Sequence, residues 1–312
     1  MLAFKERIMI TIVDAHAHLW LHQNTVVNGQ PIHQLEPNRS RSLFFGEERQ
    51  MLPPYMTDGL NTAERFLSNM DYAQVSAAVI TQEFIDGLQN DYLDVVQRQY
   101  PDRFFVFGMP DWRQAGYYHE AVALLLRGFK GLKVPAARLP KDFLVQPHFH
   151  LVLNEMEQRD AILGIELMDG DVQVSQMEEI IAAHPHLRII IGHFGMVTRP
   201  NWMSQIQLAR HENVFVESGG ITWLFNDEFY PFPSAVRAIK EAADAVGIEK
   251  LMWGSDYPRT ITAITYKMSY DFVTKSKELT DNEKKLFLSE NAKRFFGFGE
   301  LIELPYIKNM SE

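Results

Sequence analysis

The segment Arg188-Ile-Ile-Ile-Gly192 contains an unbroken run of β-branched apolar residues. Parallel strands beneath flanking helices are covered on both faces, and such runs are typical of them. The chain has eight short segments that we expect to be strands of this kind: Met9–Ala15, Ala77–Thr81, Phe104–Met109, Gly131–Pro135, Ile162–Leu167, Arg188–Gly192, Val214–Glu217 and Leu251–Gly254. The pattern therefore predicts a parallel α/β fold.

Amphipathic stretches with helical spacing lie between these segments. Apolar stripes of this kind begin at Phe149, Val174 and Val236. Repeated alternation of strand and helix fits a closed (β/α)8 barrel, the TIM-barrel fold, and we expect one such domain over residues 1–312. An open doubly wound sheet is the alternative. It usually has a glycine-rich loop after its first strand, where this chain has Asp14-Ala-His-Ala-His18.

Two segments depart from the repeat. Residues 20–63 contain four prolines, which disfavour a continuous helix, and we expect a long loop that covers the carboxyl ends of the strands. Near the end of the chain, Thr280 and Glu283 have the spacing of a capping box. This pair predicts a terminal helix over residues 281–298.

Composition limits the classes of partner. The 312 residues include 30 Lys and Arg against 40 Asp and Glu, a net charge of −10, which argues against general nucleic-acid binding. There is no cysteine, so thiolate metal sites and cysteine nucleophiles are excluded. We found no apolar run of membrane-spanning length and no signal peptide, so we expect a cytoplasmic protein. A small anionic substrate remains compatible with a locally basic pocket, and a homo-oligomer remains open.

His16 and His18 lie two residues apart at the end of the first expected strand. The period of a strand places both imidazoles on one face, where they could bind a divalent metal such as Zn²⁺. His184 and His186 have the same spacing, but they follow a helix and precede a strand. In a barrel this places them at the opposite end, which is usually structural, and we expect them to have no part in the chemistry.

His193 follows the strand that begins at Arg188, and Asp256 follows the last strand. Both positions are at the same end of the barrel as His16 and His18. Four polar groups from three strands are thus expected around one centre. This end of a parallel barrel is where active sites form.

Together, these motifs resemble the amidohydrolase superfamily, and its amidohydrolase family 2 branch in particular. The stretches that carry the resemblance are Asp14-Ala-His-Ala-His18, Gly131-Leu-Lys-Val134, Ile191-Gly-His-Phe194, Trp253-Gly-Ser-Asp-Tyr-Pro258, and Asn291-Ala292 with Phe295-Phe-Gly297. The resemblance spans residues 9 to about 298. That branch contains TIM-barrel, metal-dependent lactonases and decarboxylases.

The resemblance implies a metal site formed by His16, His18 and Asp256, with zinc or manganese as the ion. Many members have a histidine after the fifth strand, where this chain has Glu166, so Glu166 is the expected fourth ligand. Alternatively, Glu166 forms an ion pair with Lys133 and binds no metal. Activity without a metal is also an open alternative, because some lactonases of the group work without one. Asp256 and His193 are the expected catalytic residues.

Several side chains near the strand ends could bind an acidic substrate, because guanidinium and ammonium groups pair with carboxylates. We expect this role for Lys133, Arg138, Arg259 and Arg39, with Trp223 forming part of the pocket. Arg41, Trp112 and Tyr257 are further candidates for the same surroundings.

The sequence-based hypothesis is a metal-dependent hydrolase that opens a sugar-acid or carboxylated lactone. The alternative is a non-oxidative decarboxylase of an aromatic or muconate-type acid on the same scaffold. A non-catalytic carbohydrate-binding barrel is a third class, and the joint presence of His16, His18, His193 and Asp256 weighs against it.

Overall fold

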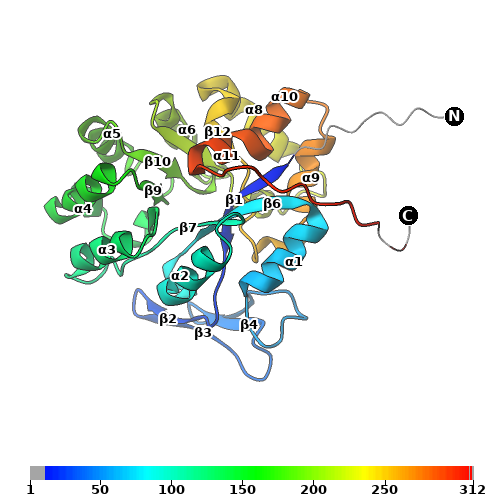
Figure 1. The fold of residues 1–312 in the computed structure, drawn as a ribbon, viewed down its shortest axis with the longest axis horizontal. Helices are drawn as coiled ribbons and strands as arrows, with labels where there is room; N and C mark the ends of the chain where they lie inside the picture. Colours follow the sequence, from blue (N-terminus) through cyan, green and yellow to red (C-terminus); the bar gives the residue numbers. More distant parts are fainter. Residues whose placement is uncertain (1–10, 309, 311–312) are drawn as a thin grey trace.

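The computed structural model describes residues 11–308 and 310. It contains two parallel sheets, with strand orders β1-β6-β7 and β12-β11-β10-β9-β8, and a four-stranded antiparallel sheet, β2-β3-β4-β5. In Figure 1 the helices lie around the outside of the parallel strands, while β2, β3 and β4 form a separate group at the bottom of the view. The parallel α/β fold predicted from the sequence is confirmed.

All eight expected parallel strands are present. Their bounds are β1 Ile12–His18, β6 Val75–Thr81, β7 Phe104–Val106, β8 Gly131–Val134, β9 Ile162–Ile165, β10 Arg188–Ile191, β11 Val214–Glu217 and β12 Leu251–Met252. The first strand begins and ends three residues later than expected, and residues 9 and 10 lie outside the described part of the chain.

Helices follow most of the strands and cover their outer faces. The longer ones are α1 Ala63–Ala73, α2 Asn90–Gln99, α3 Tyr117–Leu126, α4 Pro147–Gln158, α5 Val174–Ala183, α8 Pro233–Val246 and α9 Met268–Lys275. Shorter helices are α6 Met203–Gln207 and α7 Ile221–Leu224. No helix within the described residues combines the length and apolar character that crossing a membrane requires.

Backbone hydrogen bonds connect the two parallel sheets at both of their edges. Gly108, just after β7, accepts from Lys133 on β8 at 2.8 Å and donates to Gly131 at 3.0 Å. At the other edge, the amide of Ala15 on β1 donates to Trp253, just after β12, at 2.9 Å. A shared apolar cluster lies between the two sheets, with side chains such as Val79 and Ile190.

A β-bulge in β1 turns the two histidines toward this shared interior. Asp14 pairs with Ala78, and Ala17 pairs with Ile80. Between these two pairs β1 contains one residue more than β6. Ala15, within the bulged stretch, packs in the shared cluster, whereas Ala17 belongs to the other apolar cluster, which contains helix residues such as Phe66. The extra residue therefore changes which side chains point inward.

The segment 20–63 is not the continuous loop that the sequence led us to expect. It forms the antiparallel strands β2 Asn24–Val27, β3 Gln30–Gln34, β4 Arg41–Phe44 and β5 Glu47–Gln50. β5 is exposed along its whole length, and β2 and β3 are exposed in part, so the segment lacks the regular hydrophobic alternation by which a half-buried strand is detected. The expectation that no continuous helix forms here agrees with the structure.

The expected C-terminal helix is present, in three consecutive pieces. The capping box of Thr280 and Glu283 opens α10, Asp281–Lys285, which continues through a π-helical turn into α11, Asn291–Phe296. The Asn291 side chain donates to the carbonyls of Ile248 and Leu251, each at 2.8 Å. This helix is thereby tied to the start of β12.

We predict that Asn291→Ala destabilises the fold, because it leaves two backbone carbonyls without their side-chain donor. The expected loss in the free energy of unfolding is about 2 kcal/mol, measured by urea denaturation. Asn282→Ala is the control on an exposed position of α10, and its effect should stay within about 0.5 kcal/mol. Equal stability of the two variants would show that this tether does not hold the helix.

Candidate active site

The carboxyl ends of the parallel strands bring the predicted site residues together. His16 and His18 are on β1, Glu166 and His193 directly follow β9 and the Gly192 turn after β10, and Asp256 lies in the segment after β12. The side chains of His16, His18 and Asp256 are almost completely buried. Parallel strands end at one edge, so residues far apart in the sequence meet here.

His16, His18 and Asp256 converge at close range. The two Nε2 atoms are 3.0 Å apart, and Asp256 Oδ1 lies 3.1 Å from that of His18 and 3.7 Å from that of His16. The backbone fixes this approach as well, since the Asp256 amide donates to the His16 carbonyl at 2.8 Å.

A carboxylate lies behind each imidazole. Glu217 Oε1 is 2.7 Å from His16 Nδ1, and Asp86 Oδ2 is 2.7 Å from His18 Nδ1. Burial lowers the pKa of His16 to about 4, against the opposing attraction of Glu217. Burial also lowers the pKa of His18, but Asp86 and Asp256 together outweigh burial, and the pKa of His18 is raised.

This donor set fits a divalent cation. A carboxylate beside Nδ1 favours the proton on that nitrogen, which leaves a lone pair on each Nε2. These lone pairs and the Asp256 oxygen are electron-rich atoms that face one another, and Asp256 Oδ1 also accepts a hydrogen bond from Arg259 Nη1 at 3.3 Å. A cation or a shared proton must lie among them, and two imidazole nitrogens with a carboxylate oxygen are ligands that suit Zn²⁺.

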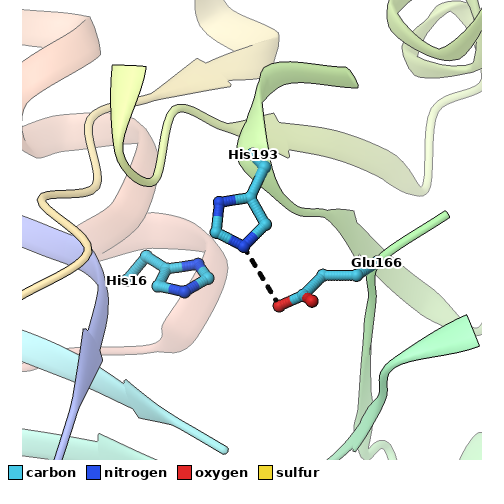
Figure 2. Close-up of side chains that lie close together, drawn as sticks. All are labelled: His16, Glu166 and His193. Atoms are coloured by element: carbon cyan, nitrogen blue, oxygen red, sulfur yellow. Dashed lines mark ion pairs between the residues drawn. The ribbon is translucent and has the colours of Figure 1, made fainter. Parts of the chain in front are cut away.

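Glu166 belongs to a second cluster beside the first. Its Oε1 lies 2.8 Å from Lys133 Nζ and 3.3 Å from His193 Nε2. Figure 2 shows Glu166, His193 and His16 pointing toward one another from three separate segments, with the Glu166–His193 ion pair drawn as a dashed line. The ligand atoms of these three residues also lie within 4.8 Å of one another. The structure thus brings Glu166 to the site while its carboxylate faces two cations.

Both ring nitrogens of His193 face acceptors. Nδ1 lies 2.8 Å from the Gly219 carbonyl, and Nε2 faces Glu166. Burial lowers the pKa of His193, but Glu166 and the other carboxylates outweigh burial and raise it to about 9. An imidazolium is therefore the form that this pocket stabilises.

Asp256 is held by two further side chains. The Trp223 indole donates to Oδ2 at 2.7 Å, and Arg259 Nη1 lies 3.3 Å from Oδ1. Burial raises the pKa of Asp256, but Arg259 and His18 more than offset it, so the pKa lies well below its usual range. Asp256 and His193 both have left-handed backbone, with φ of 57° and 55°, which non-glycine residues rarely adopt.

A cavity of about 530 Å³ opens onto this cluster. Its wall contains both ionisable groups and apolar side chains. The residues that line the cavity include His18, Glu83, Arg138, Glu166, His193, Trp223, Asp256 and Arg259, together with Phe44, Arg49, Gln50, Met51 and Met196. The volume is that of an ordinary small-molecule site.

The predicted substrate-binding residues divide into two groups. Arg138, Arg259 and Trp223 line the cavity. Lys133 is buried against Glu166 and does not line it, which matches the ion-pair alternative for that lysine. Arg39 does not line the cavity. Its half-exposed side chain pairs with Glu36 instead.

The remaining candidates lie outside the cavity wall. Arg41 pairs with Glu48, and Trp112 is buried in the apolar core, where its indole donates to the Lys133 carbonyl. His184 and His186 lie at the start of β10, the end opposite to His193, and both contact Glu157. The structure thus confirms the expected position of both histidines, at the end of the strand away from His193.

Three residues of the site were not predicted from the sequence: Glu217 and Asp86, which contact the histidines, and Arg49, which lines the cavity. Glu217 ends a predicted strand and Asp86 follows another, so a carboxylate at a strand end was the available signal. Arg49 lies in a segment expected to be a loop, and nothing in the pattern of residues 20–63 distinguishes it from Arg39.

The comparisons with known proteins agree with this geometry. The family model described as amidohydrolase matches residues 13–298. No curated protein matches the chain in sequence.

Solved structures share the fold over almost the whole chain. A probable 2-pyrone-4,6-dicarboxylic acid hydrolase of Acinetobacter baumannii with citric acid bound is 20% identical, with a TM-score of 0.65 and coverage of 93% of this chain and 100% of that chain. A zinc-bound amidohydrolase of Burkholderia multivorans is 16% identical, with a TM-score of 0.64 and coverage of 92% and 99%. A 5-carboxyvanillate decarboxylase of Sphingomonas paucimobilis is 15% identical, with a TM-score of 0.62 and coverage of 93% and 99%. Because the family model spans nearly the whole described chain, the chain belongs to the amidohydrolase family.

Proposed function

We propose that the two parallel sheets form one closed eight-stranded (β/α)8 barrel and a single domain. The hydrogen bonds of Gly108 with β8 and of β1 with the segment after β12 support this closure. The parallel bridges Ala17–Tyr257 and Gly108–Leu132 lie at the same two edges. A barrel also accounts for the apolar cluster that both sheets share.

We infer that this barrel is a hydrolase that opens a carboxylated or sugar-acid lactone. The observation that carries the proposal is the convergence of the His16 and His18 Nε2 atoms with Asp256 Oδ1 at the floor of a cavity. An amidohydrolase with this arrangement is suited to add water to a carbonyl. The likeness to a probable 2-pyrone-4,6-dicarboxylic acid hydrolase, which acts on a carboxylated lactone, supports this substrate class.

The residues that would hold a divalent ion, zinc or manganese, are His16, His18 and Asp256. When bound, such an ion supplies Lewis-acid polarisation of a carbonyl and lowers the pKa of a water molecule. The zinc in the Burkholderia multivorans structure supports this assignment. Glu166, the fourth ligand expected from the sequence, acts in this proposal through its ion pairs with Lys133 and His193 instead.

The chain's own residues perform the proton steps. Asp256, fixed by Trp223 and Arg259, accepts the proton of the attacking water. His193, whose two nitrogens both face acceptors, stays protonated and donates to the oxygen that gains charge when water adds. The acyl C–O bond then breaks, and Asp256 returns the proton to the leaving ring oxygen, which gives a hydroxy acid.

A decarboxylase is the second candidate, and one observation favours it. The cavity wall includes Phe44, Met51, Met196 and Trp223, whose apolar and aromatic surfaces suit a flat aromatic ring. The decarboxylase of Sphingomonas paucimobilis has the same fold. In that reaction Asp256 and His193 would direct a proton to the ring carbon as CO₂ leaves.

The two reactions are distinguished by what they release. A pH-stat assay with a panel of carboxylated and sugar-acid lactones should consume alkali, because ring opening produces a carboxylic acid, and should release no CO₂. The same protein with aromatic carboxylic acids tests the alternative through CO₂ release. Activity on the acids alone would favour the decarboxylase, and activity on neither panel would contradict both candidates.

We predict that Asp256→Asn lowers kcat by at least about a hundredfold, because the proton acceptor is lost while the shape is kept. The double variant His184→Gln with His186→Gln should retain nearly all turnover, since both positions are at the opposite end of β10. Steady-state kinetics on the best substrate measure both variants. If kcat of the double variant fell as much as that of Asp256→Asn, the active site would lie at the end of the strands near His184 and His186, and the proposed site would be wrong.

We predict that Glu166→Gln lowers stability and leaves the metal content unchanged. The substitution leaves the buried Lys133 ammonium without its carboxylate, which costs about 3 kcal/mol in the free energy of unfolding. Metal content per chain is measured by mass spectrometry beside a melting curve, and His16→Asn should lose the metal.

The matched control for Glu166→Gln is Asp169→Asn, a half-exposed carboxylate on the same cavity wall that pairs with Arg199. It should change stability by no more than about 0.5 kcal/mol. Loss of metal in Glu166→Gln, with activity restored by excess metal, would instead make Glu166 a ligand.

A further inference from the structure

The antiparallel sheet contributes a cation to the cavity. Phe44 on β4 and Arg49 on β5 line the cavity, as do Gln50 and the adjacent Met51. They face the same space as Asp256 and His193, which come from the parallel strands. A substrate in this cavity is therefore enclosed by two independent sheets.

The cations near the floor of the cavity are already paired with buried carboxylates. Arg138 Nε lies 2.6 Å from Glu83 Oε2. Arg259 pairs with Asp86 at 2.5 Å and with Asp256 at 3.3 Å. To take over the paired nitrogens of either arginine, an incoming anion would have to displace a buried carboxylate and leave its charge uncompensated.

Arg49 differs in the environment of its partner. It pairs with Glu47, two residues earlier on β5, with Nη2 and Oε2 2.7 Å apart. The two side chains are 55% and 68% exposed, and exposed ion pairs of this kind contribute little to stability. An anion that enters the cavity can therefore replace Glu47 at small cost.

Phe44 orients the guanidinium of Arg49. The Cζ atom of Arg49 lies 5.4 Å from the centre of the Phe44 ring, within the range of a cation–π contact. The ring supports one side of the planar group and leaves its N–H edge able to bind a carboxylate with two parallel hydrogen bonds. The same ring offers an apolar surface to a flat substrate.

We propose that Arg49 is a specificity-determining residue that binds a substrate carboxylate remote from the reacting carbonyl. The favoured ligand is a flat ring that bears a carboxylate, with the ring against Phe44 and the carboxylate at Arg49. The inference rests on the proposed function, because it assumes that the reacting carbonyl lies at Asp256 and His193. In this proposal the segments that follow the parallel strands provide the catalytic residues Asp256 and His193, and the antiparallel sheet provides the residue that selects the substrate.

The test compares two probes that differ in one charge, benzene-1,3-dicarboxylate and 3-carbamoylbenzoate. Isothermal titration calorimetry on the full-length protein, with its metal as purified, gives a Kd for each. Wild-type protein should bind the dicarboxylate about tenfold more tightly, as expected for one charge-assisted contact. Arg49→Gln should bring the ratio of the two constants close to one.

Arg41→Gln is the matched control. Arg41 is a half-exposed arginine on the adjacent strand β4, it pairs with Glu48, and it does not line the cavity. This variant loses the same net charge and should keep the tenfold preference. Melting curves of both variants verify that the sheet is intact.

Three results would overturn the proposal: no preference for the dicarboxylate in wild-type protein, binding of neither probe, or equal loss in the two variants. The lactone-opening assay tests the proposed function independently of these binding measurements. If no lactone is opened while Arg49→Gln alone abolishes the preference, the reaction is wrong and the role of Arg49 stands. If lactones are opened and the preference is unaffected, only the role of Arg49 is wrong.

Discussion

Asp14 is a buried carboxylate on which the alignment of the first and last parallel strands depends. It accepts hydrogen bonds from the Ser255 amide at 2.8 Å, the Ser255 hydroxyl at 2.5 Å, the Tyr266 hydroxyl at 2.7 Å and the His16 amide at 3.1 Å. Burial raises the pKa of Asp14 to about 7, against the lowering effect of these donors. Because Ser255 precedes Asp256 and the His16 amide is itself a donor, this one side chain places both halves of the candidate metal site.

The sequence predicted the parallel strands well because their signal is local. Three consecutive isoleucines after Arg188 identify a buried strand without reference to the rest of the chain. The bulge in β1 has no such signal, and the strand was also placed three residues too early. The antiparallel sheet was missed for a related reason: β5 is exposed along its whole length, and exposure removes the hydrophobic pattern on which strand prediction relies.

For the site, residue positions could be predicted but their pairing could not. His16, His18, His193 and Asp256 were expected to meet, since all four lie at strand ends, and the structure brings them together. Which carboxylate lies behind which imidazole depends on side-chain directions across separate strands. The sequence around Glu217 and Asp86 does not indicate that these carboxylates contact His16 and His18.

Glu166, the carboxylate that directly follows β9, affects more than one neighbouring side chain. Glu166 adds negative charge beside Asp256 and Glu217, which are also buried. A lone buried carboxylate in this position would repel them and lose its hydration. Lys133 at 2.8 Å and His193 at 3.3 Å supply the opposite charge, and the pKa of Glu166 is held well below its usual range although burial opposes this. Glu166, Lys133 and His193 therefore form one electrostatic unit, and the charge on His193 depends on Glu166, the residue that directly follows β9.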